Sequence, residues 1–201
     1  MHKSAENEPK TFSEIARAHF NSILETAASF LLKLGLKPNI VTVSGLFGHL
    51  IAAFFVTKGW ITISGIVLLV MAPVDCLDGA MARFLGESSR YGAFIDSVVD
   101  RYSEFIIYGG IFIHFMLQGN FRGCLLLYFA LAGSILVSYI RAKAESLGVS
   151  VKIGLLTRLE RYIVLIVGLI FNQLEIALSI IALLGNFTAL QRFFYVKKQI
   201  K

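Results

Sequence analysis

The sequence has little charge for its length and contains no long run of basic residues. Asp, Glu, Lys and Arg make up 16% of its 201 residues, whereas 56% are hydrophobic, and the mean hydropathy is +0.72. This composition excludes an ordinary soluble domain and predicts one compact helical membrane unit. The net charge of +6 is spread over the ends of apolar segments, which favours a membrane surface with anionic lipid over nucleic acid as the partner.

Cysteine is also scarce, and a cleavable leader is not apparent. Cys76 and Cys124 both lie in apolar stretches, so we expect reduced core residues and not a disulfide. The amino-terminal region lacks a short apolar segment followed by a small-residue cleavage site, which predicts that no signal peptide is removed.

The apolar pattern predicts an all-α integral membrane protein with six transmembrane helices. The amino-terminal arm, residues 1–37, has a capping box at Thr11 and Glu14 followed by helical periodicity, which indicates a juxtamembrane amphipathic helix in the interface. Residues 38–201 are expected to form the six-helix domain, with a tight turn at Asn172 and Gln173. The predicted spans are Ile40–Thr57, Ile61–Phe84, Gly92–Leu117, Phe121–Ser146, Arg158–Phe171 and Leu174–Tyr195.

The distribution of lysine and arginine predicts the orientation. All but three of the 19 basic residues fall in the amino-terminal arm, near Arg83 and Arg90, between Arg141 and Arg161, or in the carboxyl tail. Because positive charge is retained on the cytoplasmic side, both termini and these turns should be cytoplasmic, in the cell membrane.

Four aspartates stand out in the second and third predicted spans. Asp75 and Asp78 are three residues apart and Asp96 and Asp100 four apart, so each pair shares a helix face, and an antiparallel hairpin would bring the pairs level. Four carboxylates at one level repel unless cations join them, and an all-oxygen set suits Mg²⁺ or Mn²⁺, as one ion or two. The alternative is a structural role in which they pair with Arg83, Arg90 and Arg101, which we consider weaker.

Small residues lie between the aspartates. Gly79 and Ala82 continue the first aspartate face and Gly92 begins the opposing span, which leaves room for a substrate, although close helix packing explains each one equally well. The whole set reads Asp75-x2-Asp78-Gly79-x2-Ala82-Arg83-x8-Gly92-x3-Asp96-x3-Asp100. It resembles, without departure, the signature of the CDP-alcohol phosphotransferase family.

The resemblance implies a reaction and a role for each residue. An alcohol hydroxyl would attack the phosphorus of a CDP-linked substrate, and CMP would leave. Asp75, Asp78 and Asp96 would be metal ligands, and Asp100 a ligand, the general base, or both; we expect two Mg²⁺ or Mn²⁺ ions. The CDP pocket would be formed by Gly79, Ala82 and Arg83, joined by Asn39 and Thr42, which resemble a shorter family element. The family also implies a homodimer, for which Gly45 to Gly48 or Gly109 and Gly110 offer only generic packing signals.

Basic residues around the turn between the fourth and fifth spans suggest the acceptor. This region resembles that of phosphatidylinositol phosphate synthases and their archaeal ether-lipid counterparts, in which basic residues hold the phosphate of inositol phosphate. The candidates here are Ser138, Arg141, Arg158 and Arg161, although topological anchoring explains any one of the basic residues.

Other functions fit the sequence less well. Phosphatidylglycerophosphate synthases usually carry an arginine three residues after the threonine corresponding to Thr42, whereas Gly45 stands here. Choline- or ethanolamine-type enzymes have no evident need for a basic acceptor pocket. A divalent metal transporter fits poorly, because the acidic residues lie towards one side and do not continue along the other spans. The favoured function is therefore transfer of a phosphatidyl-type group from CDP-diacylglycerol or CDP-archaeol to a phosphorylated polyol, with inositol phosphate first.

Overall fold

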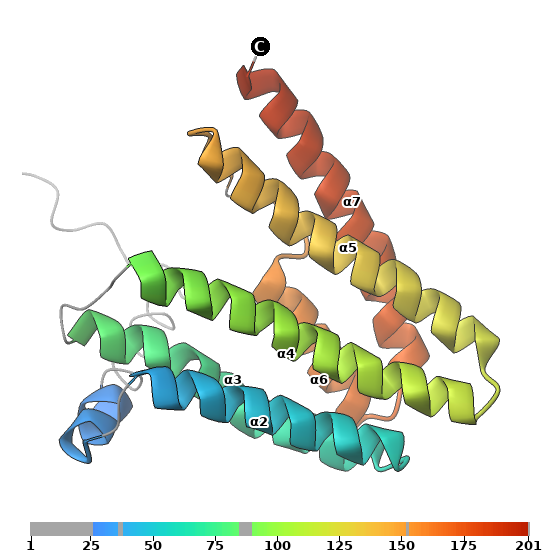
Figure 1. Ribbon diagram of the computed structural model, residues 1–201. Coiled ribbons are helices and arrows are strands. Elements are labelled where there is room, and N and C mark those ends of the chain that lie inside the picture. Colours follow the sequence, from blue (N-terminus) through green and yellow to red (C-terminus); the bar gives the residue numbers. More distant parts are fainter. Residues whose placement is uncertain (1–25, 36–37, 85–89, 152, 201) are drawn as a thin grey trace, which may run out of the picture.

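A computed structural model of the chain describes residues 26–35, 38–84, 90–151 and 153–200. Within these ranges the secondary structure is entirely helical (Figure 1). A helical segment at 26–33 is followed by α2 (Pro38–Thr57), α3 (Ile61–Phe84), α4 (Arg90–Leu117), α5 (Phe121–Ser146), α6 (Arg158–Ile170) and α7 (Leu174–Ile200). The all-α prediction is confirmed, and the predicted capping box at Thr11 and Glu14 lies outside the described residues.

The helix ends agree closely with the predicted spans. Helices α3 and α5 begin and end at the predicted residues, whereas α7 continues past Tyr195 to Ile200. The predicted span ends before the lysines of the tail, but the backbone remains helical, and Lys197 and Lys198 lie in the last turn, where cations interact favourably with the helix dipole. By length and composition α5 and α7 can cross a membrane, and Ser44–Thr57 and Ile61–Val74 are shorter apolar stretches. The count of six spans therefore stays a prediction.

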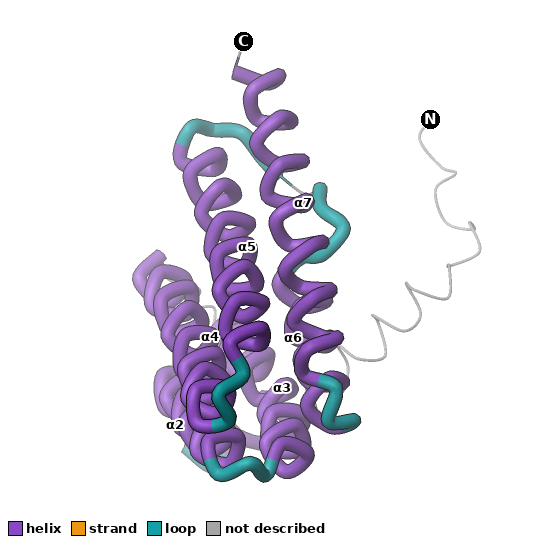
Figure 2. Tube along the Cα trace, turned by 90° about the vertical axis from the view of Figure 1, so that its right-hand side faces the viewer, coloured by secondary structure: helices purple, strands orange, loops and turns teal. Residues whose placement is uncertain are grey.

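Short turns reverse the chain after α2, α4 and α6, and these turns gather at one end of the molecule (Figure 2). The turn between α6 and α7 was predicted at Asn172 and Gln173. Asn172 adopts a φ of 55°, a left-handed conformation that asparagine tolerates better than most residues. Gln173 donates its backbone N–H to the carbonyl of Gly168 at 2.7 Å, so the turn is confirmed.

Helix α2 packs against both α3 and α4, α5 packs along α7, and α6 lies against α3 and α7 (Figure 1). Among the described residues, no Cα of α3 comes within 8 Å of a Cα of α4. The two aspartate-bearing helices, although consecutive, therefore do not pack closely backbone to backbone, and both pack on α2. That both aspartate pairs lie at one level stays a prediction.

Glycines allow the closest helix contacts. A Cβ added at Gly110 of α4 would lie 2.8 Å from the carbonyl oxygen of Ala53 in α2, and one added at Gly48 would lie 2.4 Å from the Met71 side chain. Such small residues let backbones approach in a membrane, where no hydrophobic force drives helices together. Gly48 and Gly110 thus serve packing within the chain, whereas a Cβ at Gly109 would meet nothing within 4 Å.

We expect Gly110→Ala to destabilise the protein by about 1–3 kcal/mol, because the new methyl group overlaps the backbone of α2. Gly109→Ala is the matched control, since it adds the same methyl group next door in open space. Thermal unfolding in detergent should separate the two variants, and equal melting temperatures would contradict the tight α2–α4 contact.

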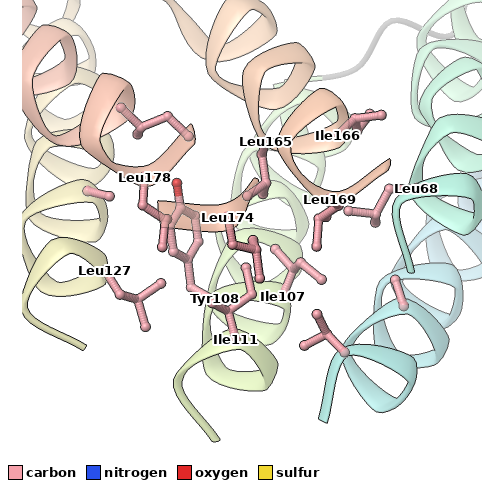
Figure 3. Packing of buried hydrophobic residues seen from close by; sticks show 14 of the residues in the cluster. Leu68, Ile107, Tyr108, Ile111, Leu127, Leu165, Ile166, Leu169, Leu174 and Leu178 are labelled. Carbon is pink, nitrogen blue, oxygen red and sulfur yellow. The ribbon is translucent and has the colours of Figure 1, made fainter. Parts of the chain in front are cut away.

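The apolar core lies where α3, α4, α6 and α7 meet (Figure 3). Leu68, Ile111, Leu169 and Leu178 are fully buried there. Tyr108 of α4 and Leu165 of α6 belong to this core and also line a cavity beside it. The core therefore supports the polar site described next.

Candidate active site

Acidic side chains run along one face of α4. Asp96, Asp100 and Glu104 are spaced four residues apart, and Tyr108 follows at the same spacing. The face passes from an exposed Asp96 to an Asp100 side chain that is 14% exposed and a Tyr108 that is 3% exposed. The column thus carries carboxylates from the surface into the helix bundle.

Arg158, the first residue of α6, pairs with Asp100. Its Nη1 contacts Oδ2 and its Nη2 contacts Oδ1 of the carboxylate, so the pairing is bidentate. The Arg158 side chain is 48% exposed. The structure therefore joins a residue predicted for the acceptor's phosphate with the residue predicted to act as base.

Arg161 lies on the same helix but in a different environment. Its side chain is 3% exposed, its Nη1 donates to the carbonyl of Leu156 at 3.2 Å, and its Nη2 is 3.7 Å from Oε1 of Glu104. Within the described part of the chain, its Nε and Nη2 have no hydrogen-bond partner. Glu104 also lies 3.7 Å from Nε of Arg101, so Arg101 pairs with Glu104, while the carboxylate of Asp100 is held by Arg158.

A small cavity of about 30 Å³ lies between α2, α4 and α6. Asp100, Glu104, Arg158 and Arg161 line it, together with His49 and Tyr162. Glu104, His49 and Tyr162 were not predicted. Glu104 continues the aspartate spacing by four residues, which was the signal available in the sequence. For His49 the signal was an ionisable residue inside the predicted span Ile40–Thr57.

The loop before α6 is tied to α7. Leu156 donates its backbone N–H to Oγ1 of Thr188 at 3.1 Å, and Nε of Arg192 donates to the carbonyl of Ile153 at 2.9 Å. Arg192 is buried and also donates through Nη1 to the carbonyl of Val137 in α5, at 2.8 Å. From the sequence, Arg192 was interpreted only as a basic residue of the carboxyl tail. An arginine inside the last predicted span was the signal for a functional or structural role.

The other two acceptor candidates, Ser138 and Arg141, have partners on their own helix, α5. The hydroxyl of Ser138 donates to the carbonyl of Ser134 at 3.2 Å, and Nε of Arg141 donates to Oε1 of Glu145 at 2.8 Å. The Arg141 side chain is 56% exposed. Arg158 and Arg161 therefore line the cavity. Ser138 and Arg141 instead make hydrogen bonds within their own helix.

The remaining predicted residues lie on α2 and α3. Helical backbone is described at Asn39, Thr42, Asp75, Asp78, Gly79 and Ala82, and at Arg83, but their side chains lie outside the described residues. Among the side chains that are described, no group of three histidine, cysteine, aspartate or glutamate residues is placed to hold a metal ion. Asp96 and Asp100 offer oxygen donors one helical turn apart, a donor type that suits Mg²⁺ or Mn²⁺.

A larger cavity of about 690 Å³ lies at the opposite end, between the turns that follow α2, α4 and α6. Its polar lining includes Gln118, Asn120 and Glu175. Neither arginine nor a pair of carboxylates lines it in the described structure, so its size does not make it the candidate for phosphate chemistry.

Comparison with known families agrees with the signature around the aspartates. The sequence model of CDP-alcohol phosphatidyltransferases matches residues 36–190, which include both aspartate pairs, Arg158 and Arg161. The chain belongs to the CDP-alcohol phosphatidyltransferase family. This confirms the resemblance seen in the sequence, and a CDP-alcohol phosphatidyltransferase is a membrane-bound transferase.

Two relatives of this CDP-alcohol phosphatidyltransferase are named as synthases of inositol phosphate lipids. The chain is 35% identical to the archaetidylinositol phosphate synthase of Pyrococcus horikoshii, covering 89% of this chain and 93% of the relative. It is 35% identical to the phosphatidylinositol phosphate synthase of Streptomyces avermitilis, covering 93% of this chain and 83% of the relative.

A solved structure also resembles the chain over most of its length. The phosphatidylinositol phosphate synthase of Mycobacterium tuberculosis with CDP-DAG bound has a TM-score of 0.80 at 28% identity, covering 87% of this chain and 94% of that one. The same synthase in complex with manganese and citrate has a TM-score of 0.78 at 27% identity, covering 86% and 88%.

Proposed function

We propose that this chain transfers a phosphatidyl-type group from a CDP-linked lipid to inositol phosphate and releases CMP. The observation that carries the proposal is the bidentate pairing of Arg158 with Asp100. The pairing puts a guanidinium that can bind phosphate beside a carboxylate that can accept a hydroxyl proton. A phosphorylated alcohol acceptor needs both groups. The activities of the relatives from Pyrococcus, Streptomyces and Mycobacterium support the same donor and acceptor classes.

The pairing suggests how binding and reaction are coupled. The planar guanidinium of Arg158 can exchange the Asp100 carboxylate for two oxygens of the acceptor's phosphate. Asp100 is then available to take the proton of the acceptor hydroxyl as its oxygen attacks the phosphorus next to the lipid. The new P–O bond forms, the bond to CMP breaks, and the proton remains on Asp100 until solvent removes it.

Asp75, Asp78, Asp96 and Asp100 would hold two Mg²⁺ or Mn²⁺ ions. When bound, the metal neutralises negative charge that builds up on the departing CMP. The oxygen donors of Asp96 and Asp100 fit such an ion, and the mycobacterial relative was solved with manganese. We infer that Asn39, Thr42, Gly79, Ala82 and Arg83 form the CDP pocket.

We further propose that Ser138 and Arg141, together with Arg158 and Arg161, bind the acceptor's phosphate. The proposal puts both termini and the active site on the cytoplasmic side of the cell membrane, because basic turns are retained on that side. It also expects a homodimer. Among the acceptors of this family, glycerol 3-phosphate is the second candidate, because it too carries a phosphate on a polyol.

The acceptor can be tested directly. Purified protein in liposomes containing CDP-diacylglycerol is offered inositol phosphate, glycerol 3-phosphate, serine or free inositol, and CMP release is measured. We expect the phosphorylated polyols to react, inositol phosphate fastest, because the arginines bind a dianion that the other two acceptors lack. Faster reaction with serine or free inositol would overturn the acceptor and leave the family assignment intact.

A further inference from the structure

Two polar side chains, a buried histidine and a half-buried tyrosine, meet beside the Arg158–Asp100 pair. His49 of α2 is 2% exposed, and its Nε2 lies 3.1 Å from the hydroxyl oxygen of Tyr162 in α6. Their ring centroids are 5.8 Å apart at an interplanar angle of 33°. Both residues line the cavity that Asp100 and Arg158 also line.

The direction of this hydrogen bond follows from the other nitrogen of His49. Its Nδ1 lies 2.9 Å from the backbone carbonyl oxygen of Gly45, which can only accept, so Nδ1 carries the proton. In a neutral ring Nε2 then accepts, and the Tyr162 hydroxyl donates to it. The backbone of α2 thereby sets the direction in which the Tyr162 O–H bond points.

The pair connects two helices that do not touch through their backbones. Among the described residues no Cα of α2 comes within 8 Å of a Cα of α6, so the two side chains span the distance between the helices. Tyr162 follows Arg158 by four residues, one helical turn, and therefore lies on the same face of α6. A tie at Tyr162 holds that face, and with it Arg158, towards α2 and towards the cavity that Asp100 also lines.

Packing alone does not require these residues. A buried imidazole and a half-buried phenol lose hydration that a hydrogen bond compensates, whereas leucine or phenylalanine fills the space without this cost. We propose that His49 is a positioning residue, which through Tyr162 holds Arg158 in place and so sets the affinity for the acceptor. The inference rests on the proposed function, since it assigns Arg158 to the acceptor's phosphate.

The test uses His49→Phe, Tyr162→Phe and the double variant, with His49→Gln as the conservative change that can still accept a hydrogen bond. We expect each Phe variant to raise the acceptor KM about tenfold, with kcat and the KM for the CDP-lipid changed less than about twofold. The double variant should be no worse than either single one, because both remove one interaction. His49→Gln should recover most of the acceptor affinity.

His114→Phe is the matched control. His114 is a second buried histidine, 5% exposed, and it lines the cavity at the opposite end. Its replacement should leave the acceptor KM unchanged, and melting temperatures of all variants are measured in parallel. Equal loss of affinity for both substrates together with a lower melting temperature would show that the pair is only structural, and normal kinetics in both Phe variants would overturn the proposal.

The unchanged enzyme separates this proposal from the proposed function. If it prefers another phosphorylated acceptor to inositol phosphate, the proposed acceptor is wrong and the same KM comparison is made with the acceptor that reacts. If the acceptor that reacts carries no phosphate, Arg158 has no phosphate to bind and the positioning role is wrong as well.

Discussion

Asp100→Asn should lower the rate of CMP release at least about a hundredfold while the protein stays folded. Asparagine keeps the shape of the side chain, but it does not take up a proton from the acceptor hydroxyl and is a weaker ligand for a divalent cation. Folding should persist because Arg158, the partner left behind, is 48% exposed and stays hydrated. Asp96→Asn is expected to lose activity to a similar extent, as are Asp75→Asn and Asp78→Asn.

Initial rates of CMP release, together with thermal unfolding in detergent, measure both parts of this prediction. Glu175→Gln is the control, because it neutralises a carboxylate at the opposite end, where Glu175 accepts a hydrogen bond from Asn120 at 2.7 Å. Excess EDTA should stop the unchanged enzyme, and Mg²⁺ or Mn²⁺ should restore it. Full activity of Asp100→Asn, or of the enzyme in excess EDTA, would contradict the role of the aspartates.

Arg158→Ala should lower kcat/KM for the acceptor by about 2–4 kcal/mol, roughly thirtyfold to a thousandfold, with much less effect on the CDP-lipid. The loss follows from removing a planar group that can bind two phosphate oxygens at once. Arg158→Lys should recover only part of it, because an ammonium group cannot make the bidentate contact. Varying each substrate separately at saturating concentrations of the other measures the two effects.

Arg122→Ala is the matched control for Arg158. The Arg122 side chain is 82% exposed and its Nε lies 3.8 Å from Glu175, so it is an arginine in an ion pair at the far end of the molecule. Its replacement should leave acceptor kinetics unchanged. If Arg158→Ala had normal kinetics, the arginine would be a topological anchor, and the acceptor assignment would be lost while the family assignment remained.

From the sequence, Arg158 and Arg161 have the same predicted role. In the structure their exposure and their partners differ. Arg161 is nearly fully buried between Glu104 and the carbonyl of Leu156, whereas Arg158 is half-exposed at the start of α6. Replacing Arg161 therefore leaves the Glu104 carboxylate in the interior with Arg101 as its remaining ion-pair partner. Spacing on a helix predicts a shared face, but burial depends on which helices cover that face.

Helix positions and the family were determined by the sequence itself. Long apolar segments separated by short turns allow few alternatives, because backbone groups in a membrane must be satisfied within helices. The aspartate signature identified the family because its positions are close in sequence, where helical spacing alone relates them.

Only the tertiary structure decided which side chains meet. Asp100 and Arg158 are 58 residues apart, and His49 and Tyr162 are 113 apart. Arg192, in the last helix, reaches the loop before α6 and the backbone of α5. No local pattern relates such residues, because their distances depend on how α2, α4, α5, α6 and α7 pack, and that packing follows from small residues and shape complementarity distributed over the whole bundle.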